Sequence, residues 1–297
     1  MDKKIVIAGG TGFVGKYLVE KFQNLGHQVL VISRKAGDIK WSDEKGMIEA
    51  LEGCEMLINL AGKSVDCRYN QKNKAAILKS RTETTTALGK AILKCENPPS
   101  LWINSSTATI YRHAIDRPMT ESTGEIGNGF SVDVAKKWEH SFFKFKHIKT
   151  RQIALRMAIV LGQKGGVMKP FTNLVRFGLG GEQGNGDQLF SWIHIEDLFQ
   201  IILFMQSRKD LQGVFNCSSP NPVTNQLLMK SLRQTVGAKV GLPCPTWLLK
   251  FGAVLIGTET ELILKSRWVI PESLLEAGYD FKYQTIAAAL TDILQKD

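Results

Sequence analysis

The sequence predicts an α/β protein in which a doubly wound parallel sheet is followed by a smaller C-terminal lobe. Two observations predict the sheet. Short β-branched runs alternate with longer helical patterns through the first half of the chain, which is the order of repeated strand–helix–strand units. These strand-like runs are almost continuously apolar, as expected when helices cover both faces of a parallel sheet.

Six strands and four helices are expected in this first half. The strands cover Lys4–Ala8, Gln28–Ser33, Asp38–Trp41, Met56–Leu60, Leu101–Thr107 and Arg151–Met157. The helices cover about Phe13–Leu25, Glu44–Leu51, Asn70–Cys95 and Ser131–His147. We therefore place the sheet domain at residues 1–160 and expect parts of 190–217 to return to the sheet.

A glycine-rich segment opens the second half. Eight of the 25 residues from Gly162 to Gly186 are glycine, which is typical of a loop, here on either side of a short helix near Lys169–Phe177. The loop is either a solvent-exposed connection or a ligand loop, because long loops in compact domains are often functional.

The remaining chain is expected to be mostly helical. Amphipathic patterns predict helices at about Glu196–Gln206 and Thr224–Thr235, and several short helices from Pro243 onward. Residues 161–297 would thus form a smaller lobe that packs against the sheet. The cleft between the two parts is the expected substrate site.

Composition excludes several classes of protein. The 297 residues are 43% hydrophobic and 22% charged, which excludes a disordered chain. The longest apolar candidate, Trp247–Thr258, is too short for a membrane span and contains Lys250. Met1 is followed almost directly by a strand-like segment, which argues against a signal peptide.

The cysteines and the net charge limit the cellular compartment and the kinds of partner that we expect. Five widely spaced cysteines without a C-x-x-C motif argue against a disulfide framework or a metal site and favour the cytoplasm. The net charge of +10 is compatible with nucleic acid, anionic cofactors or simple solubility. The lysine-rich stretches lie on amphipathic helices and no nucleic-acid-binding module is recognised, so we expect no nucleic-acid partner.

Three glycines form a phosphate-binding pattern after the first strand. Gly9, Gly12 and Gly15 are spaced three residues apart between an apolar strand and a helix, the setting in which such a pattern indicates a Rossmann-type dinucleotide site. One glycine allows the tight turn, the next lets a pyrophosphate approach the backbone, and the third allows close helix–strand packing. The expected cofactor contacts are Gly9, Thr11, Gly12, Phe13, Val14 and Gly15.

The end of the second strand indicates which dinucleotide binds. An acidic residue there would bond the ribose of NAD, but the strand ends in Ser33, Arg34 and Lys35, with no acid before Asp38. A hydroxyl and two cations suit the 2′-phosphate of NADP(H). The alternative is that Arg34 and Lys35 are solvated turn residues.

Several motifs resemble the extended short-chain dehydrogenases/reductases of the sugar-nucleotide epimerase/dehydratase type. They are the glycine turn, Asn59-Leu60-Ala61-Gly62 and Ser105-Ser106-Thr107-Ala108-Thr109-Ile110-Tyr111. Further stretches are similar to an atypical subgroup, the epimerase family proteins, whose second half carries a C-terminal domain of unknown function. These stretches include Arg81 to Thr85, Trp138-Glu139, Arg156 to Gly166, Gly184 to Asp197 and Pro271 to Phe281.

The resemblance implies further cofactor contacts. By this resemblance Ser33 and Arg34 hold the 2′-phosphate, with Lys35 beside them from the charge argument above, and the other residues line the ribose, the pyrophosphate and the nicotinamide. These others are Leu60, Ala61, Gly62, Arg81, Ser106 and Val160. A helical alternative for Arg81 is a surface cation paired with Glu83.

The chain departs from the family at the catalytic pair. Extended members use a Tyr-x-x-x-Lys motif, but alignment on Glu139 places Ser131 and Ala135 at those positions. Thr107 occupies the hydroxyl position of the family, or is a strand threonine bonded to nearby backbone. Tyr111, at the end of the fifth strand, is the other candidate proton carrier, or a packed core residue.

The sequence offers fewer signals for the residues that bind the substrate. Arg68, Gln188 and His194 are candidate substrate contacts, although a structural role at a strand–helix junction is the favoured alternative for His194. Ser191-Trp192 stands where nucleotide-sugar epimerases carry Arg-Asp, which argues against a nucleotide-sugar substrate.

Two functions follow from these residues. The first is an NADP(H)-binding oxidoreductase or epimerase-like enzyme for an unidentified small molecule, with a homodimer formed through the two long helices as in the wider family. The second is a non-catalytic NADP(H)-binding sensor or scaffold, which would not need the missing Tyr and Lys.

Overall fold

The computed structural model describes residues 3–245, 247 and 265–295. A seven-stranded sheet forms its centre, in the order β3-β2-β1-β4-β5-β6-β10, and every neighbouring pair is parallel. The strands are β1 (Lys4–Ala8), β2 (Gln28–Ser33), β3 (Ile39–Lys40), β4 (Met56–Asn59), β5 (Leu101–Thr107), β6 (Arg151–Met157) and β10 (Gly213–Cys217). The predicted doubly wound parallel sheet is confirmed.

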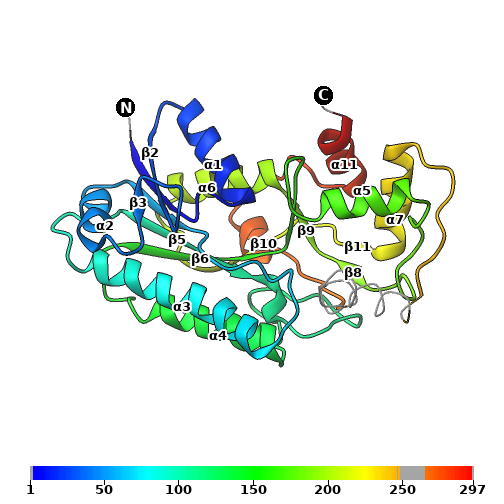
Figure 1. Cartoon of the computed structure of the whole chain (residues 1–297), viewed down its shortest axis with the longest axis horizontal. Coiled ribbons are helices and arrows are strands. Elements are labelled where there is room, and N and C mark those ends of the chain that lie inside the picture. The colour runs from blue at the N-terminus through cyan, green and yellow to red at the C-terminus, as the bar shows by residue number, and fades with distance from the viewer. Residues whose placement is uncertain (1–2, 246, 248–264, 296–297) are drawn as a thin grey trace.

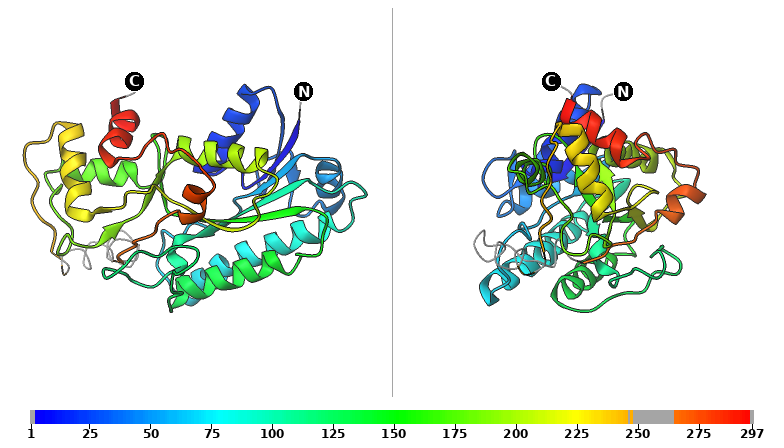
Figure 2. Two further views of the ribbon diagram at one scale, coloured as in Figure 1. Left: turned by 180° about the vertical axis from the view of Figure 1, so that it is seen from behind. Right: turned by 90° about the vertical axis from the view of Figure 1, so that its right-hand side faces the viewer.

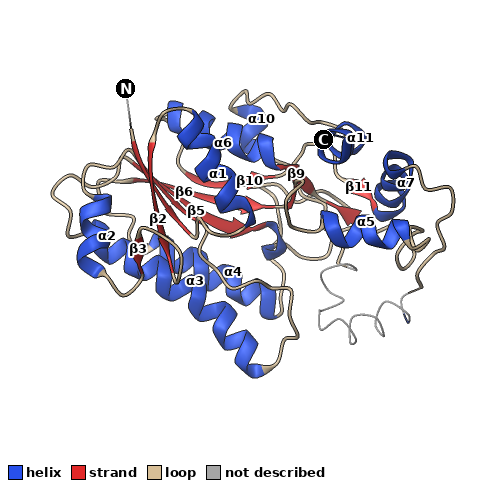
Figure 3. Cartoon of the chain, turned by 45° about the horizontal axis from the view of Figure 1, so that its top comes forward, coloured by secondary structure: helices blue, strands red, loops and turns tan. Residues whose placement is uncertain are grey.

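Helices cover both faces of this sheet (Figures 1 and 3). The helices are α1 (Phe13–Asn24) and α6 (Ile195–Ser207) on one face, and α2 (Glu44–Leu51), α3 (Gln71–Ile92) and α4 (Phe130–Phe143) on the other. Alternate residues of β1 supply the two cores, because successive side chains of a strand point to opposite faces. Ile5 and Ile7 pack with α1 and α6, whereas Val6 and Ala8 pack with the other layer.

A smaller lobe lies at one end of the long axis of the molecule (Figures 1 and 2). Its core is formed by apolar faces of α5 (Met168–Arg176), α7 (Asn225–Val236) and α11 (Ile286–Gln295). Two small sheets connect it to the main sheet, and a further short helix, α10 (Glu272–Glu276), packs against β10. The small sheets are β7 (Ile159–Leu161) with β9 (Trp192–His194), and β8 (Leu189–Phe190) with β11 (Val223–Thr224).

Most expected elements lie where the sequence places them, and the differences have local causes. The strand expected at Asp38–Trp41 is limited to β3, because the Asp38 carboxylate accepts a hydrogen bond from the Val31 amide and so belongs to the preceding loop. The helix expected to reach His147 ends at Phe143 and is followed by turns.

Part of the C-terminal prediction falls on residues that are not described. The apolar stretch Trp247–Thr258 and part of the helices expected from Pro243 lie in 246 and 248–264, outside the described residues. Within the described part of the chain, no helix combines the length and the apolar character needed to cross a bilayer.

Candidate functional site

The turn between β1 and α1 is built on glycines that serve different purposes. Gly9 has a φ of +82°, which favours glycine, and a Cβ added to it would lie 2.9 Å from the Ala61 nitrogen. A Cβ on Gly15 would lie 2.4 Å from the Gly9 carbonyl oxygen. A Cβ on Gly12 would meet nothing closer than the same oxygen at 3.5 Å. The packing of the turn therefore requires glycine at 9 and 15, while Gly12 faces open space.

The N-terminus of α1 is open to an anion. Its N-cap residue, Gly12, provides no side-chain cap, and the first turn contains no acidic residue. The first amides of a helix lack partners within the helix and attract negative charge. The turn therefore has the features of a phosphate cradle, as the sequence predicts.

A cavity of about 400 Å³ lies beside this turn, and we call it the β2-side cavity. Its lining includes predicted residues of the glycine turn and of the ends of β2 and β4, together with residues of α3. The lining residues are Gly9, Thr11, Gly12, Ser33, Arg34, Trp41, Leu60, Ala61, Gly62, Lys79, Ser80, Glu83 and Thr84.

The end of β2 presents a hydroxyl and a guanidinium to this cavity. Ser33 is buried, and its Oγ accepts a hydrogen bond of 3.1 Å from the Ala36 amide, so its own proton remains available to a ligand. Arg34 is exposed at the rim. The next acid along the chain, Asp38, is bonded to the Val31 amide at 2.7 Å. The carboxylate thus stabilises the β2–β3 loop.

A second cavity of about 350 Å³ meets the first at Leu60 and Gly62, and we call it the β5-side cavity. It combines hydroxyl groups of the β5 end with aromatic residues of α4 and of the segment before α3. The other lining residues are Lys63, Ser64, Val65, Tyr69, Ile77, Arg81, Ser105, Ser106, Thr107, Thr109, Phe130, Ser131, Val134 and Trp138. Both cavities lie at the carboxyl ends of parallel strands, where open α/β sheets bind ligands.

Arg81 lies at the junction of the two cavities. Its Nη1 donates to the carbonyl oxygens of Lys63 at 3.0 Å and Ile77 at 3.1 Å, and its guanidinium lies 5.1 Å from the centre of the Trp138 ring. Burial lowers the pKa of Arg81 to about 10. The surface pairing with Glu83 is not formed, since the guanidinium is buried, bonds the two carbonyl oxygens and lies 3.1 Å from a Cβ built on Gly62, a residue that lines both cavities. Arg81 is therefore a cation held in one position, and it lines the β5-side cavity where that cavity meets the β2-side cavity.

Thr107 is the predicted catalytic residue that reaches the β5-side cavity. Its Oγ1 accepts a hydrogen bond of 3.1 Å from the Thr109 amide at the start of the short 3₁₀ turn Ala108–Ile110. This contact is the backbone bond considered from the sequence, and it leaves the hydroxyl proton free to point to a ligand. Ser131 also lines the cavity, whereas Ala135 is buried in a core cluster.

Tyr111 lies in a buried network instead. Its side chain is 1% exposed, and its hydroxyl donates to Asn216 Oδ1 at 2.9 Å and accepts from Arg156 Nη1 at 2.9 Å. Burial raises the pKa of Tyr111 despite the Arg156 charge. Its proton is thus committed to Asn216, and its predicted catalytic role stays a prediction.

The predicted substrate residues lie elsewhere. Gln188 is buried in the lobe, where its Nε2 donates to the Gln183 carbonyl at 2.7 Å. His194 Nδ1 accepts from the Glu196 amide at 3.1 Å, and its Nε2 lies 3.4 Å from Asp292 Oδ2. Arg68 is exposed.

Among the described residues that line the two cavities, none of these three appears. His194 instead lines a separate cavity between α1 and α11, so the roles of the three in substrate binding stay predictions. Of the predicted cofactor contacts, Val160 lies in β7 and packs against the main core, and Lys35 is exposed. The described residues also contain no cluster of side chains that could hold a metal ion.

The structure adds aromatic residues that the sequence reading did not select. Tyr69 and Phe130 pack edge to face with their ring centres 5.0 Å apart, and both line the β5-side cavity with Trp138. Ser131, Val134 and Trp138 follow helical spacing, which places them on one face of α4. That spacing was the available signal, but only the fold shows that this face turns to the cavity.

The comparisons with known proteins agree with this architecture. Residues 5–218 match the NAD dependent epimerase/dehydratase family. The chain belongs to this family. Residues 244–293 match a domain of unknown function, DUF1731. Both matches confirm the resemblance found in the sequence.

Relatives within the family span the whole chain. Human epimerase family protein SDR39U1 is 31% identical over 294 residues, covering 98% of this chain and 99% of that protein. Epimerase family protein YfhF of Bacillus subtilis is 30% identical over 300 residues, covering 98% and 97%.

Two solved structures extend the comparison. A crystal structure of human SDR39U1, isoform 2, with NADPH is similar with a TM-score of 0.89 at 30% identity, covering 98% of this chain and 99% of that one. UDP-N-acetylglucosamine 4-epimerase from Bacillus cereus is similar with a TM-score of 0.77 at 18% identity, covering 99% of both chains, and shares the fold alone.

Proposed function

We propose that this chain is an NADP(H)-dependent oxidoreductase or epimerase-like enzyme that acts on a small molecule. The observation that carries the cofactor choice is the end of β2: Ser33 and Arg34 face the cavity, while Asp38 is bonded to the Val31 amide. A 2′-phosphate is compatible with this end, whereas the carboxylate that would hold an unphosphorylated ribose is engaged. The human relative crystallised with NADPH supports the same choice.

The residues present fit a dinucleotide. The open space over Gly12 and the uncapped N-terminus of α1 fit the diphosphate, and the β2-side cavity fits the adenosine end with Arg34 on its 2′-phosphate. Arg81, at the junction of the cavities, supplies a charge next to the diphosphate or the substrate. When bound, the nicotinamide supplies or accepts a hydride.

The β5-side cavity would hold the reacting carbon. The Thr109 amide orients Thr107 Oγ1 by a hydrogen bond of 3.1 Å, so the hydroxyl proton can bond a substrate oxygen in the cavity. With a substrate bound, the aromatic wall of Tyr69, Phe130 and Trp138 would shield that space from water. In this proposal Thr107 holds the oxygen of a carbonyl or carbinol, and the missing Tyr-x-x-x-Lys pair has no direct replacement.

A second candidate function is favoured by that missing pair. Ser131 and Ala135 stand at the two positions, and the Tyr111 hydroxyl is sealed in the buried network. A non-catalytic NADP(H) sensor or scaffold would need no proton carrier at the nicotinamide end. The two functions share the cofactor and differ in turnover.

One experiment separates them. The purified protein is titrated with NADPH and NADH, and NADPH oxidation is then followed with a panel of aldehydes, ketones and nucleotide sugars. An enzyme should turn over at least one compound, and Thr107→Val should lower that rate by about 10²–10³-fold, the effect of removing one hydrogen-bond donor to the reacting oxygen, without changing NADPH affinity. Tight NADPH binding with no turnover across the panel would support the sensor, and stronger binding of NADH would overturn the cofactor assignment.

The proposal also covers the compartment, the partners and the oligomeric state of the protein. We place it in the cytoplasm, with no nucleic-acid partner, and expect a homodimer through α3 and α4, which lie side by side (Figure 1). Size-exclusion chromatography with light scattering tests the dimer, and a monomer at micromolar concentration would contradict it.

A further inference from the structure

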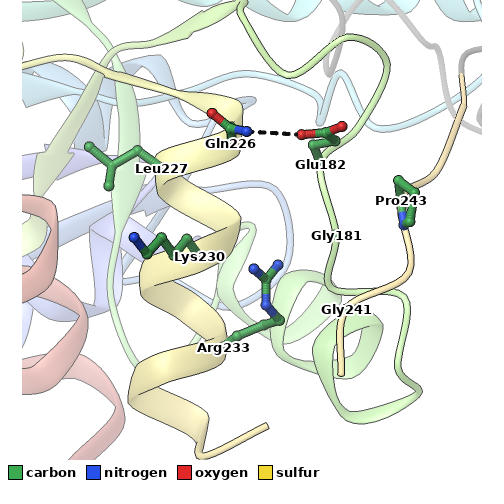
Figure 4. Close-up of a pocket in the computed structure, with 8 residues that line it drawn as sticks. All are labelled: Gly181, Glu182, Gln226, Leu227, Lys230, Arg233, Gly241 and Pro243. Atoms are coloured by element: carbon green, nitrogen blue, oxygen red, sulfur yellow. Dashed lines mark hydrogen bonds between the residues drawn. The ribbon is translucent and has the colours of Figure 1, made fainter. Parts of the chain in front are cut away.

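A third cavity, of about 500 Å³, lies in the smaller lobe, away from both parts of the proposed cofactor groove, and we call it the α7 cavity (Figure 4). Its walls are the exposed face of α7, the glycine-rich segment near residue 181, and the segment around 242. The lining residues are Gly181, Glu182, Gln226, Leu227, Lys230, Arg233, Gly241 and Pro243. None of these described residues lines the β2-side or β5-side cavity.

Glycines shape this cavity around Arg233. A Cβ added to Gly241 would lie 2.5 Å from Arg233 Cδ, and one added to Gly180 would lie 3.1 Å from Arg233 Cγ. A Cβ on Gly181 would lie 2.5 Å from the Leu242 backbone. Glycine at 180 and 241 thus leaves room for the stem of Arg233, and glycine at 181 lets the two backbone segments approach each other. Part of the glycine-rich loop therefore determines where the Arg233 side chain lies.

The guanidinium is held at one point and faces the cavity with the rest. Arg233 Nη1 donates to the Gly180 carbonyl oxygen, and a guanidinium carries five N–H donors. In Figure 4 the group points into the space between α7 and the segment at 241–243. Within the described part of the chain, no ion pair joins Arg233 or Lys230 to a carboxylate.

Two cations on α7 border one cavity. Lys230 and Arg233 are three residues apart on the helix, which makes them neighbours on its surface. Glu182 is the carboxylate in the lining, and it accepts a hydrogen bond of 3.2 Å from Gln226 Nε2 at the other end of the cavity (Figure 4). Both cations therefore belong to the α7 wall, with the Arg233 guanidinium in the space between α7 and the 241–243 segment and the Lys230 ammonium on the other side of the helix in this view (Figure 4).

We propose that the α7 cavity binds a phosphate group, either as the free ion or on a small phosphorylated molecule, through Arg233, with Lys230 on the same wall as the second cation that can turn to it. A phosphate dianion matches two cations, and its oxygens match the fork of N–H donors on a guanidinium. The glycine backbone leaves room for the group to approach, and the volume exceeds what phosphate alone fills. The site is separate from the cofactor groove and does not depend on the proposed function.

The test is a calorimetric titration with inorganic phosphate, ribose 5-phosphate and acetate, in the presence and absence of saturating NADP⁺. The wild-type protein should bind both phosphates in either condition and bind acetate at least about tenfold more weakly. Affinity for ribose 5-phosphate should rise between pH 5 and pH 7.5, because a phosphate monoester becomes a dianion with a second pKa of about 6. Tighter binding of the ester than of the free ion would show that the cavity also recognises the rest of a phosphorylated molecule; equal binding would show that it recognises the phosphate group alone.

Variants distinguish phosphate binding in this cavity from general electrostatic attraction of phosphate to a basic protein. Arg233→Met should weaken phosphate binding at least about tenfold, as expected for loss of charge-assisted hydrogen bonds, and Lys230→Met should weaken it less. Lys239→Met is the matched control, an exposed cation of the same lobe, and should leave affinity unchanged.

Gly241→Ala is the sharper variant. It keeps every charge but places a methyl group 2.5 Å from Arg233 Cδ, which must displace that side chain. The proposal expects it to weaken phosphate binding about as much as Arg233→Met does. Equal binding by the wild-type protein, Arg233→Met and Gly241→Ala would overturn the proposal, and so would loss of all phosphate binding when NADP⁺ is present. Thermal unfolding of each variant shows that the comparison is between folded proteins.

Discussion

Glu139 and Arg156 form a two-point ion pair next to the β5-side cavity. Arg156 Nε lies 2.9 Å from Glu139 Oε1, and Arg156 Nη2 lies 2.9 Å from Glu139 Oε2. Each side chain is 12% exposed. The same carboxylate accepts a hydrogen bond of 2.6 Å from the hydroxyl of Ser106, a residue of the cavity wall. The pair therefore joins α4 to β6 and orients a group at the proposed nicotinamide end.

Replacing one partner should be costly. We expect Glu139→Gln to lower the free energy of unfolding by about 3–5 kcal/mol, because it leaves the Arg156 charge largely buried without its counter-ion. Urea denaturation measures the effect. Asp210→Asn is the control, since its ion pair with Arg208 is 61% exposed on the aspartate side and should be worth less than about 1 kcal/mol. Equal losses in the two variants would contradict this assignment.

The sequence could predict the frame of the site but not this pair. The long apolar runs predict β1, β2, β5 and β6 with the observed bounds, because a strand buried on both faces leaves a continuous apolar signal. The two- and three-residue strands β7, β8, β9 and β11 leave no period to detect. Glu139 is 17 residues from Arg156 and 33 from Ser106, and no local pattern records such contacts.

The same limit explains which candidate site residues the sequence could place and which it could not. The close packing of Gly15 on Gly9 joins residues close in sequence, so spacing predicts it, whereas the contact of Gly9 with Ala61 comes from the fold. The position of His194 depends on Asp292 in the last helix, and that of Tyr111 on Asn216 in β10. Their side chains are therefore placed by tertiary packing, which sequence reasoning could narrow to alternatives but not decide.

The two glycines of the turn should respond differently to substitution. Gly15→Ala places a Cβ 2.4 Å from the Gly9 carbonyl oxygen, so we expect it to destabilise the fold by about 1–3 kcal/mol. Gly12→Ala meets only an ordinary contact of 3.5 Å within the protein. It should leave the melting temperature nearly unchanged yet weaken NADPH binding, because the methyl group occupies the space proposed for the diphosphate.

Thermal unfolding and NADPH titration of both variants test this pair. If Gly12→Ala binds NADPH as well as the wild-type protein, the diphosphate does not lie over that residue. If Gly15→Ala is as stable as the wild-type protein, the close packing of the turn does not require glycine at position 15.

Arg34 should decide between the two dinucleotides. We expect Arg34→Ala to weaken NADPH binding by about 10–100-fold, the effect of losing hydrogen bonds to a charged group, and to leave the weaker NADH binding unchanged. Lys40→Ala is the matched control, because Lys40 is an exposed cation of the neighbouring strand β3 and lies outside the described lining of the β2-side cavity. Fluorescence titration measures both affinities. An equal loss in the two variants would indicate general electrostatic attraction instead of a contact with the 2′-phosphate.

Glu196 should make stability depend on acid pH. Burial alone would raise its pKa, but hydrogen bonds from Lys21, Tyr17 and Gln200 outweigh burial and lower the pKa to about 2. An unfolded glutamate has a pKa of about 4.3. Because the folded pKa is the lower one, the carboxylate stabilises the fold fully above about pH 4.3, and this stabilisation is lost as pH falls through about 2.

The corresponding variant is Glu196→Gln. At pH 7 it should lower the free energy of unfolding by about 1–3 kcal/mol, the range for hydrogen bonds to a charged group, and the difference from the wild-type protein should shrink steadily between pH 4.3 and pH 2. Urea denaturation at pH 7, 4.5 and 3 measures it. Glu49→Gln is the control, since that glutamate side chain is 66% exposed and its pair with Lys45 should contribute less than about 1 kcal/mol. A difference between Glu196→Gln and the wild-type protein that stays constant from pH 7 to pH 3 would show that the ionised carboxylate is not what joins α1 to α6.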